Sequence, residues 1–291
     1  MTIHKLLHYC NTRLKQASIE KPDFEAELLL AHILKKDRAY ILSHKEDKVS
    51  TFTAIKIAYL CQKRTQNTPL AYLLKEKHFY NLSFIVNKNV LIPRPESELF
   101  IDYFKDFNFN NTLTIDIGTG SGALIISLIK NLNLDLFNNY HFLATDVSKK
   151  ALIIAKKNAK KHKVSNDVEF KHCDLLSQIS ANTLNKHENI YILANLPYLN
   201  EKEMKEESIK KEPKSALYSQ NNGLSHYFKL LKQIKLKLEN HNNLILAMEI
   251  NPAQQDDLVK EINKNFSNTK MDVIKDYSKN DRLVIAKINY S

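Results

Sequence analysis

The side chains best suited to chemistry lie in one short segment, Asn195-Leu196-Pro197-Tyr198. An asparagine side chain both accepts and donates hydrogen bonds, and tyrosine offers a flat aromatic face. Pro197 stiffens the segment and removes a backbone donor. The Asn195 side-chain oxygen and the Leu196 carbonyl could therefore hold a planar NH2 group by its two hydrogens while Tyr198 stacks on it. The alternative is an asparagine-initiated turn fixed by proline, without a chemical role.

A glycine cluster lies about 75 residues before this segment. The chain has 291 residues and only 4 glycines, and three of them fall in the run Asp116-Ile-Gly-Thr-Gly-Ser-Gly122. This run separates an apolar stretch from a helical pattern, so a ligand could approach the main chain at a helix N-terminus. A dinucleotide and S-adenosylmethionine both fit such a loop, because Gly118, Gly120 and Ala123 also match the dinucleotide fingerprint.

Two carboxylates follow the next apolar stretches. Asp146 ends HFLATD, and its carboxylate could accept hydrogen bonds from both ribose hydroxyls of an adenosyl group or could cap the helix that begins near Ser148. Asp174 follows the third stretch and could accept a hydrogen bond from an adenine amino group or serve as a cap. The sequence contains no cysteine spacing typical of zinc and no Ser/His/Asp or Cys/His arrangement, so we expect no metal site.

Alternating strands and helices are expected to position these residues from about residue 97 onward. Apolar runs typical of buried strands lie at 113–117, 141–145, 168–172, 190–194, 243–250, 271–275 and 282–288. Helical patterns follow the first, second, fourth and fifth runs, and none lies between the last two. This order predicts an α/β fold whose mainly parallel sheet is covered on both faces and carries an antiparallel edge strand.

The beginning of the chain has a different pattern. Residues 23–35 and 49–64 have apolar side chains at helical spacing, which predicts a small helical domain over residues 1–75. The stretch that follows is rich in β-branched and aromatic residues and is interrupted by asparagines, which favour turns. This pattern predicts a β-hairpin linker over residues 76–96. The α/β domain would then occupy residues 97–291.

The composition narrows the class of protein further. A hydrophobic fraction of 43% is enough for a core and argues against general disorder. The net charge of +11 comes almost wholly from lysine, since only five residues are arginine. We expect these lysines to lie on solvated helix faces rather than to form a nucleic-acid binding surface. The three cysteines are expected to be reduced packing residues. No apolar run is long enough to span a membrane and no signal peptide is recognisable, so a cytoplasmic protein is expected.

Together these features resemble class I S-adenosylmethionine-dependent methyltransferases with a Rossmann-like fold. Asn-Leu-Pro-Tyr resembles the Asn-Pro-Pro-Tyr motif of those that methylate planar amino groups of adenine, cytosine or glutamine. More narrowly, the chain is similar to the release-factor glutamine N5-methyltransferases. This resemblance extends over Thr68 to Tyr72, Leu91-Ile-Pro-Arg-Pro-Glu-Ser-Glu98, Glu212-Pro213, Asn222-Gly223-Leu224 and Asp276 to Arg282. Two departures are Leu196 in place of the family's first proline and Leu175 where an aromatic residue often lies against adenine.

The resemblance implies methyl transfer from S-adenosylmethionine to N5 of the glutamine in the Gly-Gly-Gln motif of class-1 peptide-chain release factors, leaving S-adenosylhomocysteine. It implies a cofactor site made of Asp116, Gly118, Thr119, Gly120, Ser121, Gly122, Asp146, Asp174, Leu175 and Asn195. The residues Asn195, Leu196, Pro197 and Tyr198 would be catalytic and, with Arg94, would bind the substrate. Residues 1–75 would recognise the release factor.

Three alternatives stay open. An adenine-N6 methyltransferase of ribosomal RNA is suggested by Asn-Leu-Pro-Tyr and by the positive charge, although in the ribosomal RNA adenine dimethyltransferases the cofactor loop lies near the N-terminus. A glutamine methyltransferase of a ribosomal protein would share the chemistry. A non-catalytic release-factor-binding module is disfavoured by the intact Gly118 to Gly122, Asp146 and Asn195. We expect a monomer that needs neither a membrane nor an obligatory nucleic acid.

Overall fold

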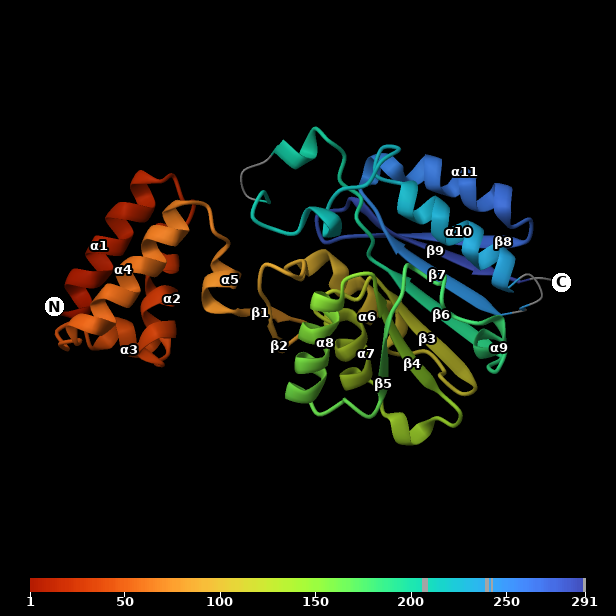
Figure 1. Cartoon of the computed structure of the whole chain (residues 1–291), viewed down its shortest axis with the longest axis horizontal. Helices are drawn as coiled ribbons and strands as arrows, with labels where there is room; N and C mark the ends of the chain where they lie inside the picture. Colours follow the sequence, from red (N-terminus) through yellow and green to blue (C-terminus); the bar gives the residue numbers. More distant parts are fainter. Residues whose placement is uncertain (206–208, 239–240, 242, 290–291) are drawn as a thin grey trace. The chain divides into compact units, whose positions relative to one another are not determined.

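The computed structural model describes residues 1–205, 209–238, 241 and 243–289 of the chain. They form two compact units, one made of residues 1–76 with 209–211 and the other of residues 77–205 with the described residues from 212 to 289. Figure 1 labels the helices and strands of both units.

The first unit is helical, as its sequence pattern predicts. Its helices are α1 (Ile3–Gln16), α2 (Pro22–Leu34), α3 (Arg38–Ser43), α4 (Thr51–Thr65) and α5 (Leu70–Leu74). The side chains of Thr2, Asp37 and Ser50 each accept a hydrogen bond from a backbone N–H in the first turn of α1, α3 and α4. Pro22 occupies the first turn of α2, where its missing N–H costs nothing.

A short hairpin follows, as the sequence predicts. Strand β1 (Glu76–Phe79) turns into β2 (Leu82–Ile85) through Tyr80 and Asn81, whose φ angles are 45° and 60°. Positive φ at both turn positions matches the right-handed twist of the two strands. The second asparagine-rich stretch, at 87–89, forms a separate turn in which the Val90 N–H donates to the Asn87 carbonyl.

The second unit contains a seven-stranded sheet in the order β5-β4-β3-β6-β7-β9-β8. Its strands are β3 (Thr112–Ile117), β4 (His141–Asp146), β5 (Val168–His172), β6 (Asn189–Ala194), β7 (Leu244–Glu249), β8 (Thr269–Lys275) and β9 (Asp281–Ile288). The pairs among β3 to β7 are parallel, and β9 runs antiparallel to both β7 and β8. The predicted α/β sheet with an antiparallel element at one edge is confirmed, and β9 inserts between β7 and β8.

Helices cover both faces of the sheet (Figure 1). On one face α6 (Glu98–Phe104), α7 (Ala123–Asn131) and α8 (Lys149–Lys161) share an apolar core with the sheet. On the other face α9 (Ala181–Leu184), α10 (Ser225–Leu238) and α11 (Gln255–Asn265) form a second core. Short 3-10 turns lie at Pro95–Ser97, Leu134–Leu136, Glu203–Lys205, Lys214–Ala216 and Pro252–Gln254.

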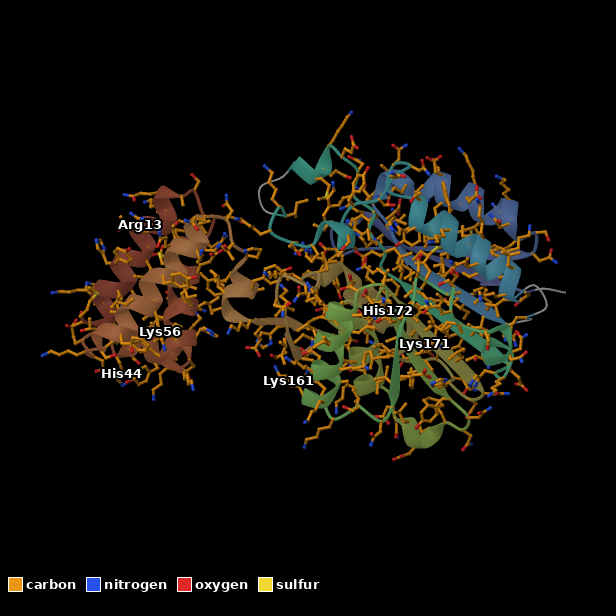
Figure 2. The ribbon with its side chains drawn as sticks, in the orientation of Figure 1. Arg13, His44, Lys56, Lys161, Lys171 and His172 are labelled. Atoms are coloured by element: carbon orange, nitrogen blue, oxygen red, sulfur yellow. The ribbon has the colours of Figure 1, made fainter. Side chains whose placement is uncertain are left out.

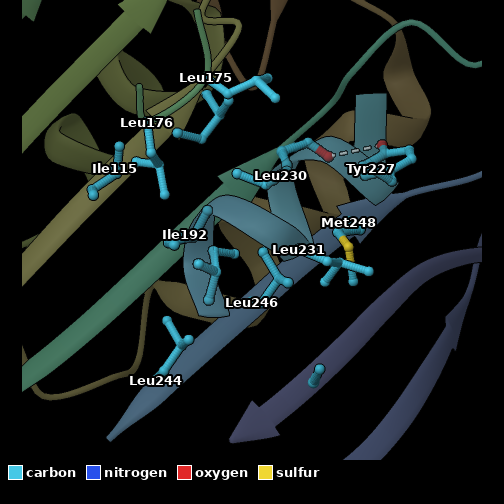
Figure 3. Packing of buried hydrophobic residues seen from close by; sticks show 14 of the residues in the cluster. Ile115, Leu175, Leu176, Ile192, Tyr227, Leu230, Leu231, Leu244, Leu246 and Met248 are labelled. Atoms are coloured by element: carbon cyan, nitrogen blue, oxygen red, sulfur yellow. Dashed lines mark hydrogen bonds between the residues drawn. The ribbon is translucent and has the colours of Figure 1, made fainter. Parts of the chain in front are cut away.

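Strand residues alternate between the two cores. In β6, Ile190, Ile192 and Ala194 belong to the core under α10, whereas Tyr191 and Leu193 belong to the core under α7. Figure 3 shows part of the core under α10, where α10 places Tyr227 and its leucines on β6 and β7. Burial on both faces explains why these strands read as continuous apolar runs.

Basic side chains are spread over both units. Arg13 on α1, Lys56 on α4 and Lys161 on α8 are all exposed (Figure 2). Cys10, Cys61 and Cys173 are free and buried, as predicted. Among the described residues, no helix is long and apolar enough to cross a membrane.

Candidate active site

The carboxyl ends of the parallel strands bring the predicted site residues to one rim of the sheet. The glycine run follows β3, Asp146 ends β4, Asp174 follows β5 and Asn195 follows β6. Strands β3 and β6 are neighbours in the sheet. Strands β4 and β5 lie beyond β3, and strands β7, β9 and β8 lie beyond β6, so the strand order reverses between β3 and β6. Open α/β sheets bind ligands in the crevice at such a switch point.

A cavity of about 390 Å³ lies at this rim. Its lining includes eight of the predicted residues: Gly118, Gly120, Asp146, Asp174, Leu175, Asn195, Leu196 and Pro197. The other predicted residues lie outside this lining: Arg94, Asp116, Thr119, Ser121, Gly122 and Tyr198. The cavity thus joins the backbone of the glycine loop to the Asn-Leu-Pro segment.

At two positions of the loop, both the backbone conformation and the close approach of neighbouring side chains favour glycine over a residue with a Cβ. Gly122 begins α7 with φ of 81°, and a Cβ there would lie 2.8 Å from Ile126 Cδ1 and 3.3 Å from Ala155 Cβ on α8. Gly118 has φ of 72°, and a Cβ there would lie 3.2 Å from Leu196 Cδ2. Side chains at these positions would push the loop away from α8 and from the Asn-Leu-Pro segment.

Asp116 lies beneath the loop and is almost wholly buried. Its Oδ2 accepts a hydrogen bond of 2.6 Å from Thr119 Oγ1, while its Oδ1 has no hydrogen-bond partner among the described residues. Burial raises the pKa of Asp116 to about 7, an effect that the Thr119 hydrogen bond opposes and the Asp146 charge reinforces. An unpartnered buried carboxylate oxygen is costly, so a cationic or N–H donor at this site would stabilise it.

Asp146 holds the glycine loop against the start of α8. Its Oδ2 accepts from the Gly120 N–H at 2.9 Å and its Oδ1 accepts from the Ser148 N–H at 2.7 Å. The cap of α8 itself is Ser148, whose side chain accepts from the Ala151 N–H. Burial raises the pKa of Asp146, against the lowering effect of these two N–H donors. Each carboxylate oxygen keeps a second lone pair for a ligand in the cavity.

Asp174 and Leu175 form the wall of the cavity next to β5. Asp174 is half exposed and pairs with Lys229 Nζ on α10. Leu175 is buried and has φ of 57°. A leucine in this left-handed conformation is held by its surroundings, because the conformation is unfavourable for a side chain of that size.

Asn195 and Leu196 are fixed from behind the cavity. Asn195 Nδ2 donates to Ser97 Oγ at 2.8 Å. The Leu196 N–H donates to the hydroxyl of Tyr227 at 3.3 Å, and that hydroxyl in turn donates to the Ala194 carbonyl or to the Glu249 carbonyl. A proline at 196 has no N–H to give, so this anchor exists only because residue 196 is not proline.

The Tyr198 ring lies behind the segment. Its hydroxyl donates to Glu249 Oε1 at 3.2 Å, and its carbonyl accepts from Gln254 Nε2 at 2.8 Å. Burial, with a smaller contribution from the Glu249 charge, raises the pKa of Tyr198. Glu249 is itself buried; burial raises its pKa to about 7, although Ser97, Arg282 and Tyr198 all favour the ionised form.

Arg94 forms an ion pair with a buried carboxylate. Its Nη2 lies 2.5 Å from Glu212 Oε1, and Glu212 Oε2 accepts from the Ile92 N–H at 3.1 Å. About a third of the Arg94 side chain stays exposed. The Ile-Pro-Arg-Pro and Glu-Pro segments, far apart in sequence, are thus joined.

Sequence reasoning gave no role to several residues of this region. Ser97, Tyr227, Glu249 and Gln254 hold the Asn-Leu-Pro-Tyr segment in place, and His226 lines the cavity. One signal was available, since Glu249 is a lone carboxylate that closes the apolar run of β7. Among the described residues, no cluster of His, Cys, Asp or Glu is placed to hold a metal ion.

Comparison with known families divides the chain in two. The PrmC N-terminal domain matches residues 5–74, and a methyltransferase domain matches residues 108–283. The hMettl16 catalytic domain, solved in complex with an RNA hairpin, superposes with a TM-score of 0.52 over 90% of this chain and 91% of that one. Its sequence is 14% identical, so this likeness concerns the fold alone.

Curated relatives match nearly end to end. Release factor glutamine methyltransferase of Mycoplasma mycoides is 34% identical, covering 94% of this chain and 96% of that protein. Release factor glutamine methyltransferase of Dictyoglomus turgidum is 31% identical, covering 97% of each. A bifunctional methyltransferase of Rickettsia typhi is 30% identical over 99% of this chain but only 58% of its own length. The chain therefore belongs to the release factor glutamine methyltransferase family.

Proposed function

We propose that this chain transfers a methyl group from S-adenosylmethionine to N5 of the glutamine in the Gly-Gly-Gln motif of class-1 peptide-chain release factors. The observation that carries the proposal is the shared cavity. Asn195, Leu196 and Pro197 line the same space as the backbone of Gly118 and Gly120. A segment whose acceptors would suit a planar amide thus lies beside a loop that would suit an adenosyl cofactor.

The residues present fit S-adenosylmethionine. Asp146 offers acceptors suited to ribose hydroxyls, and the apolar Leu175 suits one face of an adenine ring. The unpartnered Oδ1 of Asp116 lies under the same loop and suits the charge of the methionine ammonium. Thr119, Ser121 and Gly122 would shape the loop, and Asp174 could accept from the adenine amino group if it exchanged its bond to Lys229. When bound, the cofactor supplies an electrophilic methyl group on a sulfonium.

The chain's own contribution is to orient the acceptor. An amide nitrogen is a poor nucleophile because its lone pair is delocalised into the carbonyl. The Asn195 oxygen and the Leu196 carbonyl would accept its two hydrogens and favour the pyramidal nitrogen of the transition state over the planar ground state. Holding that nitrogen in line with the methyl group contributes further. No strong base is needed, because an N-methylated, N-protonated amide is very acidic.

The proposed function also gives roles to residues 1–75, Arg94 and Tyr198. Residues 1–75 would bind the body of the release factor, and Arg94 would help to bind the substrate loop while its ion pair with Glu212 joins two segments of the rim. Tyr198, which lies outside the cavity lining and donates to Glu249, would support the segment from behind. The protein would act as a cytoplasmic monomer without an obligatory nucleic acid.

A substrate panel tests the proposal. The protein is incubated with labelled S-adenosylmethionine and, separately, with a class-1 release factor, ribosomal proteins and ribosomal RNA. A release factor whose Gly-Gly-Gln glutamine is replaced by alanine serves as the matched control. We expect label in the intact release factor and none in its control. Label only in RNA would favour the adenine methyltransferase, and label only in a ribosomal protein would favour the second glutamine substrate.

A further inference from the structure

A chain of hydrogen bonds runs from Asn195 into the protein. Asn195 Nδ2 donates to Ser97 Oγ at 2.8 Å, and Ser97 Oγ donates to Glu249 Oε2 at 2.5 Å. The other oxygen of Glu249 accepts from the Tyr198 hydroxyl at 3.2 Å. Three separate elements supply this chain: the turn before α6, the end of β7 and the segment after β6.

Ser97 and Glu249 lie outside the cavity. Their exposed fractions are 3% and 1%, and neither residue belongs to the lining, whereas Asn195 does. A substrate in the cavity would therefore meet Asn195 and not the two residues behind it. Any effect of Ser97 and Glu249 on the reaction must pass through Asn195 or Tyr198.

Above its pKa of about 7, Glu249 is ionised, and the hydrogen bonds then have a fixed direction. An ionised carboxylate only accepts, so the hydroxyls of Ser97 and Tyr198 both give their protons to Glu249. Ser97 Oγ then has only lone pairs to offer, and the atom of Asn195 that faces it must be the donor Nδ2. The asparagine oxygen is left for the other side, where an NH2 group of a substrate needs an acceptor.

We propose that Ser97 and Glu249 are positioning residues for methyl transfer: through their hydrogen bonds they hold the Asn195 amide in the one orientation that presents its oxygen, rather than its NH2, to the substrate. This proposal rests on the function proposed above for the site. A flipped amide would point its NH2 group at the substrate hydrogen that the Asn195 oxygen would otherwise accept, which removes one of the two interactions that orient the nucleophile.

Ser97→Ala tests the first link. It removes the acceptor that selects Nδ2 and leaves Asn195 free to flip. We expect kcat on the release factor to fall about 10- to 100-fold, by analogy with the loss of an outer hydrogen-bond partner of a metal ligand. The KM for S-adenosylmethionine and its affinity by calorimetry should stay within about twofold.

Ser127→Ala is the matched control. Ser127 is a fully buried serine on α7 whose Oγ has no hydrogen-bond partner among the described residues. The same chemical change there should leave kcat unaltered. Equal kcat values for the wild-type protein, Ser97→Ala and Ser127→Ala would overturn the proposal, and so would an equal loss in both variants.

Glu249→Gln tests the second link with almost no change in shape. Glutamine offers one oxygen and one NH2 group where the carboxylate offered two acceptors, so it cannot accept from both Ser97 and Tyr198. At a pH near 8, above the raised pKa of Glu249, kcat should fall by at least about fivefold while calorimetric cofactor affinity is retained. Wild-type kcat in this variant would overturn the role of Glu249.

A readout that needs no turnover separates this proposal from the proposed function. The side-chain NH2 of Asn195, identified in nitrogen NMR spectra by its loss in Asn195→Ala, should exchange slowly with water in the wild-type protein and in Ser127→Ala. Exchange should be about tenfold faster in Ser97→Ala and Glu249→Gln. Fast exchange in the wild-type protein would overturn the proposal. If exchange behaves as expected but no glutamine is methylated, the orientation of Asn195 stands and the substrate assignment fails.

Discussion

Gly223 holds the Asn-Leu-Pro-Tyr segment from outside the cavity, and its replacement by alanine should be severe. Its φ of 88° is a conformation that side chains rarely adopt. A Cβ at this position would overlap the Tyr198 carbonyl and the Nε2 of Gln254. That Nε2 donates both to the Tyr198 carbonyl, at 2.8 Å, and to the Asn222 carbonyl, at 2.6 Å. Alanine would therefore force apart a backbone carbonyl and the side chain that satisfies it.

The magnitude follows from two contributions. The left-handed conformation costs an alanine about 1 to 2 kcal/mol. Losing the hydrogen bonds of the buried Gln254 amide costs roughly 1 to 3 kcal/mol more. Gly120→Ala isolates the first contribution, because Gly120 has φ of 56° and its Cβ would have its nearest neighbour at 3.9 Å. Gly223→Ala should thus lower the free energy of unfolding by about 1 to 3 kcal/mol more than Gly120→Ala does.

Urea unfolding of both variants without cofactor measures this difference. At a temperature well below the unfolding transition, Gly223→Ala should also lower kcat, because the Tyr198 carbonyl can no longer keep its place. Equal destabilisation by the two substitutions would refute the reasoning that Gly223 is required by close approach.

Further predictions concern the site, its charges and the helical unit. Asn195→Ala should lower kcat at least about 100-fold while calorimetric cofactor affinity stays within about threefold; unaltered turnover would remove Asn195 from the mechanism. Burial raises the pKa of Glu249 from 4.5 and of Asp116 from 3.8, each to about 7, so the folded state binds these protons more tightly than the unfolded chain. Stability without cofactor should therefore fall as pH rises from about 4 to about 7, and Glu249→Gln should make that fall shallower in urea titrations; an equal slope would contradict the assignment. Removing residues 1–75 should lower kcat/KM for an intact release factor at least about tenfold and spare cofactor binding; unchanged methylation would show that the helical unit is not needed to bind the substrate.

Local sequence patterns predicted much of the fold and eight of the residues that line the cavity. The strand at Val168–His172 has the predicted bounds, and β4 and β6 differ by one residue. Such runs are readable because burial on both faces demands continuous apolar residues. Gly118, Gly120 and Asn195 could be predicted to lie near one another because each follows a parallel strand of one sheet, and all three line the cavity.

Long-range partners could not be predicted in the same way. Ser97 is 152 residues from Glu249 and 98 from Asn195, and only the folded sheet brings the three together. The pairing of Asp174 with Lys229 on α10 is of the same kind. The insertion of β9 between β7 and β8 also depends on packing, because two consecutive strands indicate an antiparallel pair without saying which of them meets β7.

The central claim is that the methyl group reaches the side-chain nitrogen of one glutamine. Its most direct test is tandem mass spectrometry of a class-1 release factor after incubation with the protein and S-adenosylmethionine, with Asn195→Ala as the inactive comparison. We predict a gain of one methyl group on the amide nitrogen of the Gly-Gly-Gln glutamine, dependent on Asn195. A methyl group on any other residue, or an unmodified release factor beside methylated ribosomal RNA, would contradict the account.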